Sequence, residues 1–269
     1  YNDNIMILSI GNSYLEKINE VSQPGGSATN LSISLAHQKK PVLLKSHIGE
    51  DENGQLVLNY LLEAGVNVDY VVRCDVTSIS IANLSDGQTT FSRIPSPYSL
   101  ESLQLDQITQ RVNVVVCTGS LLINSPHLQQ ELIDFLQQSK ATFYLDLNPR
   151  SPLQIENIQQ LFDRANYLHI SSDDVKFYPP ELFRKAVNKY LLVTNKSWVK
   201  CILNGKTVFQ TKLDPLEKVV NTIGAGDSFN SGFIDAGLQT EIREEEIAER
   251  VAKGVQMART ACQRQEAWV

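Results

Sequence analysis

The stretch "VVNTIGAGDSFNSGF", from Val219 to Phe233, places three small residues directly before an aspartate. Gly224, Ala225 and Gly226 run into Asp227, and the apolar and small residues that follow are compatible with a helix. A helix N-terminus has backbone N–H groups without partners and carries partial positive charge. Glycines let a bulky anion approach the backbone closely. The three small residues therefore predict an anion hole for a phosphoryl group.

Asp227 would stand beside that phosphate, where two negative charges repel each other unless the carboxylate has a chemical task. A fitting task is to take a proton from a hydroxyl group as it attacks the phosphate. The alternative is structural, with Asp227 as the helix N-cap and the glycines as a simple turn. This stretch alone does not decide between the two interpretations.

The composition is that of a globular protein with a sizeable core: 269 residues, 42% hydrophobic and 20% charged. This length allows one large α/β domain, or one domain with a small appendage. The net charge of −6 predicts no binding to nucleic acid or to an anionic membrane, and no apolar run approaches the length of a membrane span. The first residues lack the features of a signal peptide, so we expect a cytoplasmic protein. Its four cysteines are far apart and are expected to be free thiols.

Strand-like and helix-like segments alternate along most of the chain. We expect a first helix from Thr29, a second over 54–65 and a last one from about Glu244. Three short strand-like segments between Val68 and Ile94 predict a small β flap, and a hairpin turns at Asn204-Gly205. The remaining strands are expected at 5–10, 41–49, 112–117, 142–147, 167–171 and 190–194. This order predicts a doubly wound, mostly parallel α/β core with helices on both faces, plus the flap.

Two short motifs are rejected as nucleotide sites. "NGKT" at Asn204 resembles the end of a P-loop, but Lys200 stands where that motif needs a glycine, and the turn joins two strands. "GAG" at Gly224 lacks the third glycine of a dinucleotide fingerprint, because Phe229 stands there. The four histidines are scattered, which gives little support to a metal cluster or a histidine-based triad.

Three motifs together resemble those of the ribokinase-like (PfkB-type) carbohydrate kinases. "NTIGAGDSFNSGF" is similar to the C-terminal signature D-T-x-G-A-G-D-x-F. "PGGSATNLSISLA", from Pro24 to Ala36, resembles the Gly-Gly followed by an asparagine-bearing helix, and "IGEDENG", from Ile48 to Gly54, resembles the G-x-D-x-x-G turn. The resemblance covers nearly the whole chain, with the motifs in the family's order.

Within this family, three further segments resemble fructokinases. "YLDLNPRSPL" (Tyr144 to Leu153) and "FSRIPSPYSL" (Phe91 to Leu100) are similar to segments of fructokinases and 2-keto-3-deoxygluconate kinases, and "LHISSDDVKFY" (Leu168 to Tyr178) to a fructokinase segment. The resemblance implies an ATP- and Mg²⁺-dependent sugar kinase, most like fructokinase. The alternatives are a 2-keto-3-deoxygluconate kinase and a non-catalytic protein that binds sugar or nucleotide on the same fold.

The resemblance also implies roles for individual residues. It makes Asp227 the general base and Gly224, Ala225 and Gly226 the anion hole. The implied acceptor-binding residues are Gly25, Gly26, Asn30, Glu16, Arg93 and Arg150, with Asp146 and Asn148 near the ligand or capping the next turn. The implied nucleotide-binding residues are Thr194, Asn195 and Asp174. The whole chain, 1–269, would be one kinase domain with a β lid drawn from roughly residues 12–28 and 68–98, and a homodimer through the lid would fit the family.

Several positions depart from the family's pattern. Asn221 replaces an aspartate tied to the cation environment of the phosphate loop, so dependence on a monovalent cation stays open. Glu16 replaces the aspartate that grips the sugar, and its structural alternative is an exposed surface acid. "VTNKSW" (Val193 to Trp198) lacks the glycines of the family's nucleotide segment. The chain is also short between Leu15 and Gly25, which means either a reduced lid or residues missing from the sequence.

Overall fold

The computed structural model describes residues 5–19, 21–85, 88–98, 100–118, 121–122, 125–148, 158–235 and 242–269. Strands and helices alternate along these residues, as expected from the sequence. In chain order the elements are β1 (Ile7–Ile10), β2 (Tyr14–Ile18), β3 (Val21–Gly25), α1 (Ser27–His37), β4 (Val42–Lys45), β5 (His47–Gly49), α2 (Glu52–Ala64), β6 (Val72–Cys74), β7 (Ile79–Ser85), β8 (Gln88–Ile94), η1 (Leu105–Gln107), β9 (Val114–Cys117), α3 (Pro126–Ser139), β10 (Thr142–Leu147), α4 (Gln159–Arg164), β11 (Tyr167–Ser171), η3 (Val175–Phe177), α5 (Pro180–Arg184), β12 (Tyr190–Asn195), β13 (Trp198–Leu203), β14 (Lys206–Lys212), α6 (Ala225–Asp235) and α7 (Glu244–Cys262).

Within the described residues, one large sheet has the strand order β14-β13-β12-β11-β10-β9-β1-β4. The neighbours from β4 to β12 pair in parallel, and β13 and β14 extend the sheet as the predicted antiparallel hairpin. Parallel strands need crossover connections, which the helices supply. The chain builds outward from β1 to β4 and then from β9 toward β12, so the strand order reverses between β1 and β9. Open α/β sheets bind ligands beside such a reversal.

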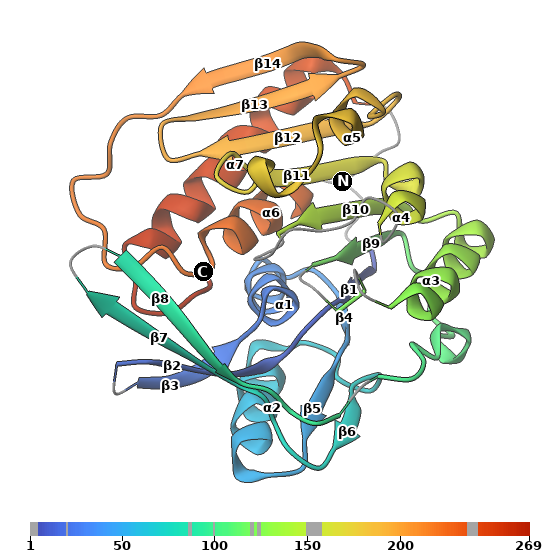
Figure 1. Cartoon of the computed structure of the whole chain (residues 1–269), viewed down its shortest axis with the longest axis vertical. Coiled ribbons are helices and arrows are strands. Elements are labelled where there is room, and N and C mark those ends of the chain that lie inside the picture. Colours follow the sequence, from blue (N-terminus) through green and yellow to red (C-terminus); the bar gives the residue numbers. More distant parts are fainter. Residues whose placement is uncertain are drawn as a thin grey trace.

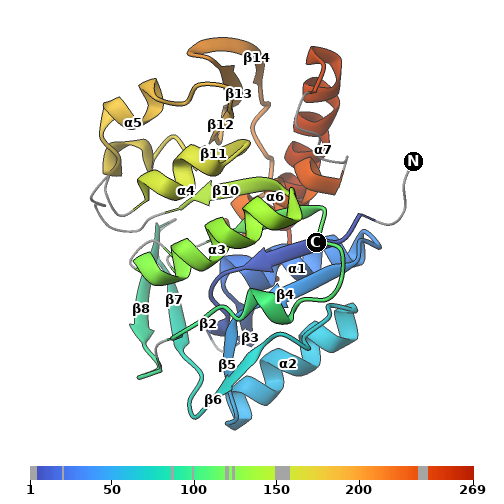
Figure 2. The same cartoon turned by 90° about the vertical axis from the view of Figure 1, so that its right-hand side faces the viewer.

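Helices cover both faces of this sheet, which confirms the predicted doubly wound architecture (Figures 1 and 2). One core lies between the sheet and α3, α4 and α5, and Leu8, Val115 and Leu132 belong to it. The other core lies under α1, α6 and α7, and Ile7, Val114 and Phe233 belong to it. Ile7 and Leu8 are adjacent in β1 and enter opposite cores, because successive side chains of a strand point to opposite faces.

A second, smaller sheet has the order β3-β2-β7-β8 and is built from residues 14–25 and 79–94. Only Gly11, Asn12 and Ser13 separate β1 from β2, so the small sheet is attached at the carboxyl end of β1 (Figure 1). Both stretches fall inside the segments from which the sequence predicts a lid.

Two details of the sequence prediction are wrong. "PVLLKSHIG" is predicted as one strand but divides at Ser46 into β4 and β5, and β5 leaves the large sheet to pair with β6. The flap is predicted as three consecutive strands, yet β6 pairs with β5 and not with β7. The partner of β7 is β2, in parallel. Sequence proximity favours hairpin neighbours, whereas this pairing joins strands that are far apart in the chain.

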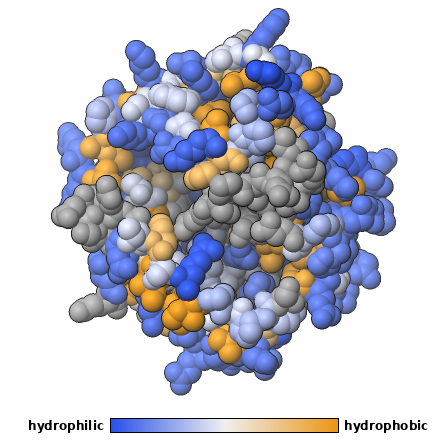
Figure 3. Space-filling view, viewed as in Figure 1, coloured by the Kyte–Doolittle hydropathy of each residue, from blue (hydrophilic) through white to orange (hydrophobic). Residues whose placement is uncertain are grey.

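The cysteines are free, as the sequence predicts, and Cys74, Cys117 and Cys201 are buried. Burial raises the pKa of the Cys201 thiol to about 12, so this thiol stays protonated and unreactive. The face seen in Figure 3 is mostly hydrophilic, with apolar residues in small scattered patches. Among the helices that the structure describes, none is both long and apolar enough to cross a membrane.

Candidate active site

The predicted anion turn directly precedes α6. The Ala225 N–H donates to the Thr222 carbonyl oxygen over 3.3 Å, and the Ser228 N–H donates to the Gly224 carbonyl oxygen over 2.8 Å, which starts the helix. Gly224 has a φ of +74°, and a Cβ atom there would overlap the carbonyl oxygen of Ala267. Only glycine fits this position without moving the turn.

Asp227 lies in the first turn of α6 and is 7% exposed. Its Oδ2 atom accepts a hydrogen bond of 2.9 Å from Nδ2 of Asn30, which is buried on α1. The structure therefore joins two predicted site residues that are 197 positions apart. Because α6 begins at Ala225, Asp227 is past the cap position, and its interpretation as the N-cap is wrong.

The two glycines of the N-terminal motif lie where β3 ends and α1 begins. Gly25 is the last residue of β3, and Gly26 is the N-cap of α1. Gly26 has a φ of +102°, and a Cβ atom there would overlap the carbonyl oxygen of Asn12. The chain thus turns sharply from the small sheet into the helix that carries Asn30.

Glu16 and Arg93 lie in one row of cross-strand neighbours on the small sheet. The row runs from Gln23 on β3 to Glu16 on β2, Ser80 on β7 and Arg93 on β8. Cross-strand neighbours project from the same face. Glu16 is 1% exposed, so its interpretation as a surface acid is wrong. The Arg93 guanidinium lies 5.4 Å from the centre of the Tyr14 ring, a cation–π contact.

Asp146 and Asn148 stand at the carboxyl end of β10. Asp146 is 3% exposed. The Asn148 side-chain amide donates to Ser27 Oγ over 2.9 Å and more weakly to Asp146 Oδ2 over 3.4 Å. Asn148 therefore links this strand end to the start of α1, beside the two glycines. Arg150, predicted as a substrate contact, lies outside the described residues.

His169 occupies the centre of a buried polar chain that the sequence analysis does not predict. Its Nδ1 atom is 2.8 Å from Asp146 Oδ1, and its Nε2 atom is 3.0 Å from Thr194 Oγ1. An ionised carboxylate only accepts hydrogen bonds, so the proton belongs on Nδ1, and Nε2 of a neutral ring accepts from the Thr194 hydroxyl. The ring also stacks on Phe229 of α6, with centroids 5.3 Å apart. The chain thus lies directly against the helix that carries Asp227.

The three predicted nucleotide-binding residues lie at the ends of β11 and β12. Thr194 is bound to His169, as described above. The Asn195 amide donates to Ser172 Oγ over 2.7 Å and accepts from the Ser197 N–H over 3.0 Å, so it also holds the β12–β13 turn. Asp174 precedes the short helix η3, and its N–H donates to the Ser171 carbonyl oxygen.

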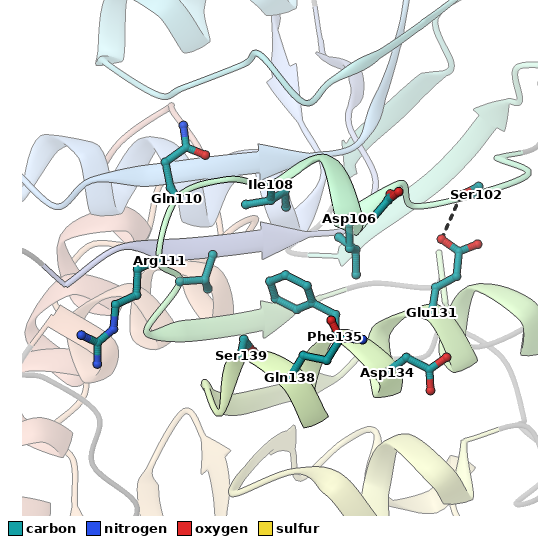
Figure 4. A pocket seen from close by; sticks show the side chains of 12 residues that line it. Ser102, Asp106, Ile108, Gln110, Arg111, Glu131, Asp134, Phe135, Gln138 and Ser139 are labelled. Carbon is teal, nitrogen blue, oxygen red and sulfur yellow. Dashed lines mark hydrogen bonds between the residues drawn. The ribbon is translucent and has the colours of Figure 1, made fainter.

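An open pocket of about 560 Å³ lies elsewhere, between η1 and α3 (Figure 4). Asp106, Glu131 and Asp134 line it, and Glu131 accepts a hydrogen bond from Ser102. None of the predicted site residues contributes to this pocket. It is therefore separate from the turn and the strand ends that hold the predicted residues.

Among known proteins, a ribokinase and a probable fructokinase are similar to this chain at low sequence identity. A ribokinase of Bacillus subtilis (strain 168) is 27% identical over 224 residues, which are 78% of this chain and 72% of the relative. A probable chloroplastic fructokinase, fructokinase-6 of Arabidopsis thaliana, is 26% identical over 241 residues, 78% of this chain and 61% of the relative.

Solved structures confirm the fold. A fructokinase double mutant from Vibrio cholerae O395, in a form with fructose, ADP and potassium ion bound, has a TM-score of 0.81. It is 16% identical, and the match covers 98% of this chain and 94% of that one.

The pfkB family carbohydrate kinases match residues 8–268 of this sequence. The match spans the glycine turn, Asp227, the asparagine helix and the strand ends described above. Members of this family, ribokinases and fructokinases among them, are phosphotransferases that act on sugar hydroxyls. This chain, with nearly its whole length inside the match, belongs to the pfkB family of carbohydrate kinases.

Proposed function

We propose that this kinase transfers the γ-phosphate of ATP to a hydroxyl of a neutral sugar, with a fructose-like ketohexose as its acceptor. The observation that carries the proposal is the buried Asp227 at the start of α6, held by Asn30 and preceded by the glycine turn. A base beside an anion hole is the arrangement that phosphoryl transfer to a hydroxyl group needs.

In this mechanism Asp227 takes the proton of the attacking sugar hydroxyl. Asn30 fixes the orientation of this carboxylate through its 2.9 Å hydrogen bond. Backbone N–H groups of the Gly224–Gly226 turn stabilise the negative charge on the transferred phosphoryl group. Positioning and charge stabilisation supply most of the catalysis in this class of reaction.

The nucleotide would lie over the ends of β11 and β12, near Thr194, Asn195 and Asp174. In the described ranges, no group of three or more acidic, histidine or cysteine side chains is arranged so that it could hold a metal ion. A magnesium ion would therefore take its ligands mainly from nucleotide phosphates and water, which is its usual habit in kinases. When bound, it would neutralise charge on the phosphate oxygens.

The choice of a neutral sugar follows from Glu16. Its carboxylate is buried in the row that also contains Gln23 and Ser80. A buried carboxylate accepts hydrogen bonds from sugar hydroxyls and repels an acidic substrate. This argues against 2-keto-3-deoxygluconate as the acceptor, although Arg93, at the exposed end of the row, is a candidate for binding its carboxylate.

The small sheet is proposed to act as a lid that excludes water from the phosphoryl transfer, and to carry the contact between the two subunits of a homodimer.

The free cysteines suit a reducing compartment and support a cytoplasmic location.

The test is ADP release with Mg-ATP and a panel of acceptors: fructose, glucose, ribose, 2-keto-3-deoxygluconate and no sugar. We expect the highest kcat/KM with fructose. In Asp227→Asn, kcat should fall by about 10²–10⁴-fold, since a general base contributes on that scale. Asp134→Asn is the control, because it makes the same substitution at an exposed position on α3. It should keep full activity.

Two results would contradict the proposal. Sugar-dependent ADP release that survives Asp227→Asn would remove the base assignment. A folded, ATP-binding protein that is silent with every sugar would instead support the non-catalytic alternative.

A further inference from the structure

Asn221 holds the anion turn to the end of the chain through its side-chain amide. It is 5% exposed. Its Nδ2 atom donates to the carbonyl oxygens of Arg264 and Gln265, over 3.2 Å and 2.9 Å. Its Oδ1 atom accepts from the Ile223 N–H over 2.7 Å. Both amide hydrogens and the amide oxygen are therefore used, which satisfies the two carbonyl groups and fixes the backbone just before Gly224.

Two more contacts make the turn and this C-terminal segment one unit. The Val220 N–H donates to the Cys262 carbonyl oxygen over 2.8 Å. Gly224 packs so closely on the carbonyl of Ala267 that a Cβ atom would overlap it. The position of the anion turn thus depends on which group binds the backbone carbonyl oxygens that follow α7.

A carboxylate at position 221 could not make the same contacts. Its oxygens would face the carbonyl oxygens of Arg264 and Gln265, and oxygen atoms of like partial charge repel at these distances. A cation between them would remove the repulsion, and carbonyl and carboxylate oxygens are the ligands that alkali cations take. The family that this chain resembles has an aspartate at this position, and the Vibrio cholerae fructokinase was solved with potassium ion bound.

The residues of this chain do not fit a monovalent cation here. The amide N–H groups of Asn221 already point at the carbonyl oxygens that would be its ligands, and no anionic group replaces the aspartate at this position. We propose that the Asn221 amide takes the structural place of a monovalent cation beside the anion turn, so that this kinase works without potassium. The proposal rests on the proposed role of the turn in phosphate binding.

The test compares wild type and Asn221→Asp in potassium chloride and in tetramethylammonium chloride at matched ionic strength. Melting temperature is the first readout, because it needs neither sugar nor nucleotide. Wild type should melt at the same temperature in both salts. Asn221→Asp should melt lower in tetramethylammonium, and added potassium should raise its melting temperature in a saturable way.

Activity is the second readout. Wild-type ADP release should change by less than about 2-fold between the salts. Asn221→Asp should lose about 10-fold or more without potassium, less than the about 10²–10³-fold that complete loss of an oxyanion-hole donor costs, because the turn is displaced and not removed. Asn59→Asp, an exposed change of the same charge on α2, should respond to neither salt. Asn221→Ala, which removes the donors without adding charge, should be impaired in both salts.

A saturable rise of the wild-type melting temperature with potassium would overturn the proposal, as would a loss of wild-type activity without it. The proposal also fails if Asn221→Asp folds and is equally impaired in both salts. If Asn221→Asp does not fold, the wild-type comparison decides alone. Silence in ADP release with every sugar would contradict the proposed function, while the melting curves would still decide the role of Asn221.

Discussion

Two polar groupings meet at α6, and they are built in opposite ways. The anion turn and its base lie within seven consecutive residues, Asn221 to Asp227. The Asp146–His169–Thr194 chain takes one residue from each of three neighbouring strands, with 23 and 25 positions between them. The first grouping is a local motif, and the second exists only once β10, β11 and β12 pair in register. A motif search finds the first. Of the second, the family resemblance gives Asp146 and Thr194 but not His169, which joins them.

Loss of the two groupings should also affect different kinetic constants. The turn holds the atoms that react, so its distortion should lower kcat. The strand-end chain orients Thr194, which lies on the proposed nucleotide side, so its loss should raise the KM for ATP more than it lowers kcat. Variants in each grouping can therefore separate the chemical step from nucleotide binding.

Among the variants that distinguish the two groupings, Gly224→Ala should have the largest effect. The new Cβ atom would overlap the Ala267 carbonyl, so the turn must shift, and loss of a preorganised donor costs about 10²–10³-fold in kcat. ADP release measures this. Gly205→Ala is a matched control, because Gly205 has the same φ of +74° but nothing within 4 Å of its Cβ position. Equal losses in the two variants would mean that backbone strain, and not the contact with Ala267, is responsible.

A smaller effect is expected for His169→Phe. The new ring can still stack on Phe229 but loses both hydrogen bonds, so the Thr194 hydroxyl is no longer oriented. We expect the KM for ATP to rise about 10-fold, the cost of one lost hydrogen bond to a buried group, with a smaller change in kcat and in the KM for the sugar.

Three comparisons complete this experiment. His169→Gln, which keeps one amide for hydrogen bonding, should recover part of the affinity for ATP, and His127→Gln on the exposed surface of α3 should match wild type. A fall in kcat with an unchanged KM for ATP would assign His169 to the chemical step instead.

The sequence predicts the parts of this protein whose signals are local. The bounds of β10 and β11 agree with the expected strands because each is a short apolar run between polar residues. The helix expected over 54–65 corresponds to α2, which ends at Ala64 and is capped by Gly65 with a φ of +87°. The predictions that failed depend on pairing between strands that are distant in the sequence. The partner of β6 and the place of His169 are set by strands from other parts of the chain, and no spacing rule within the sequence reports them.

The alternative interpretation of Glu16 as an exposed surface acid is an instructive error of the same kind. Its sequence context is polar, with Lys17 next to it, so an exposed acid is a reasonable alternative. In the structure it is buried on β2, in a row with Gln23 of β3 and Ser80 of β7. The side chains that surround a charged residue are set by this long-range pairing, which composition does not reveal.

The Asp51 side chain makes one contact that is local in the sequence and one that is long-range. The smallest predicted effect concerns this residue. Its Oδ1 atom accepts from the Gly54 N–H over 2.9 Å, which caps α2 locally. Its Oδ2 atom accepts from the N–H of Thr77, 26 positions away, over 3.1 Å. Burial alone would raise the pKa of Asp51, but the hydrogen bonds from Thr77 and Gly54 outweigh it and lower the pKa.

A carboxyl group whose pKa is lowered by folding stabilises the folded state above its unfolded pKa, and this contribution is lost as the pH falls through the folded pKa. Asp51→Asn should therefore lower the free energy of unfolding by about 0.5–1.5 kcal/mol at neutral pH, the net value of one hydrogen bond. Asparagine can still cap α2, but its side chain has one acceptor oxygen where the carboxylate has two. The difference from wild type should shrink in acid. Urea unfolding at both pH values measures this, with ADP release expected to stay near wild type. Thr77→Val removes the hydroxyl bond to Asp51 together with the bond that the hydroxyl accepts from the Gly49 N–H. Its loss of stability is therefore an upper limit on what the hydroxyl contact with Asp51 contributes. A negligible loss would assign the stabilisation to the local cap and the Thr77 N–H.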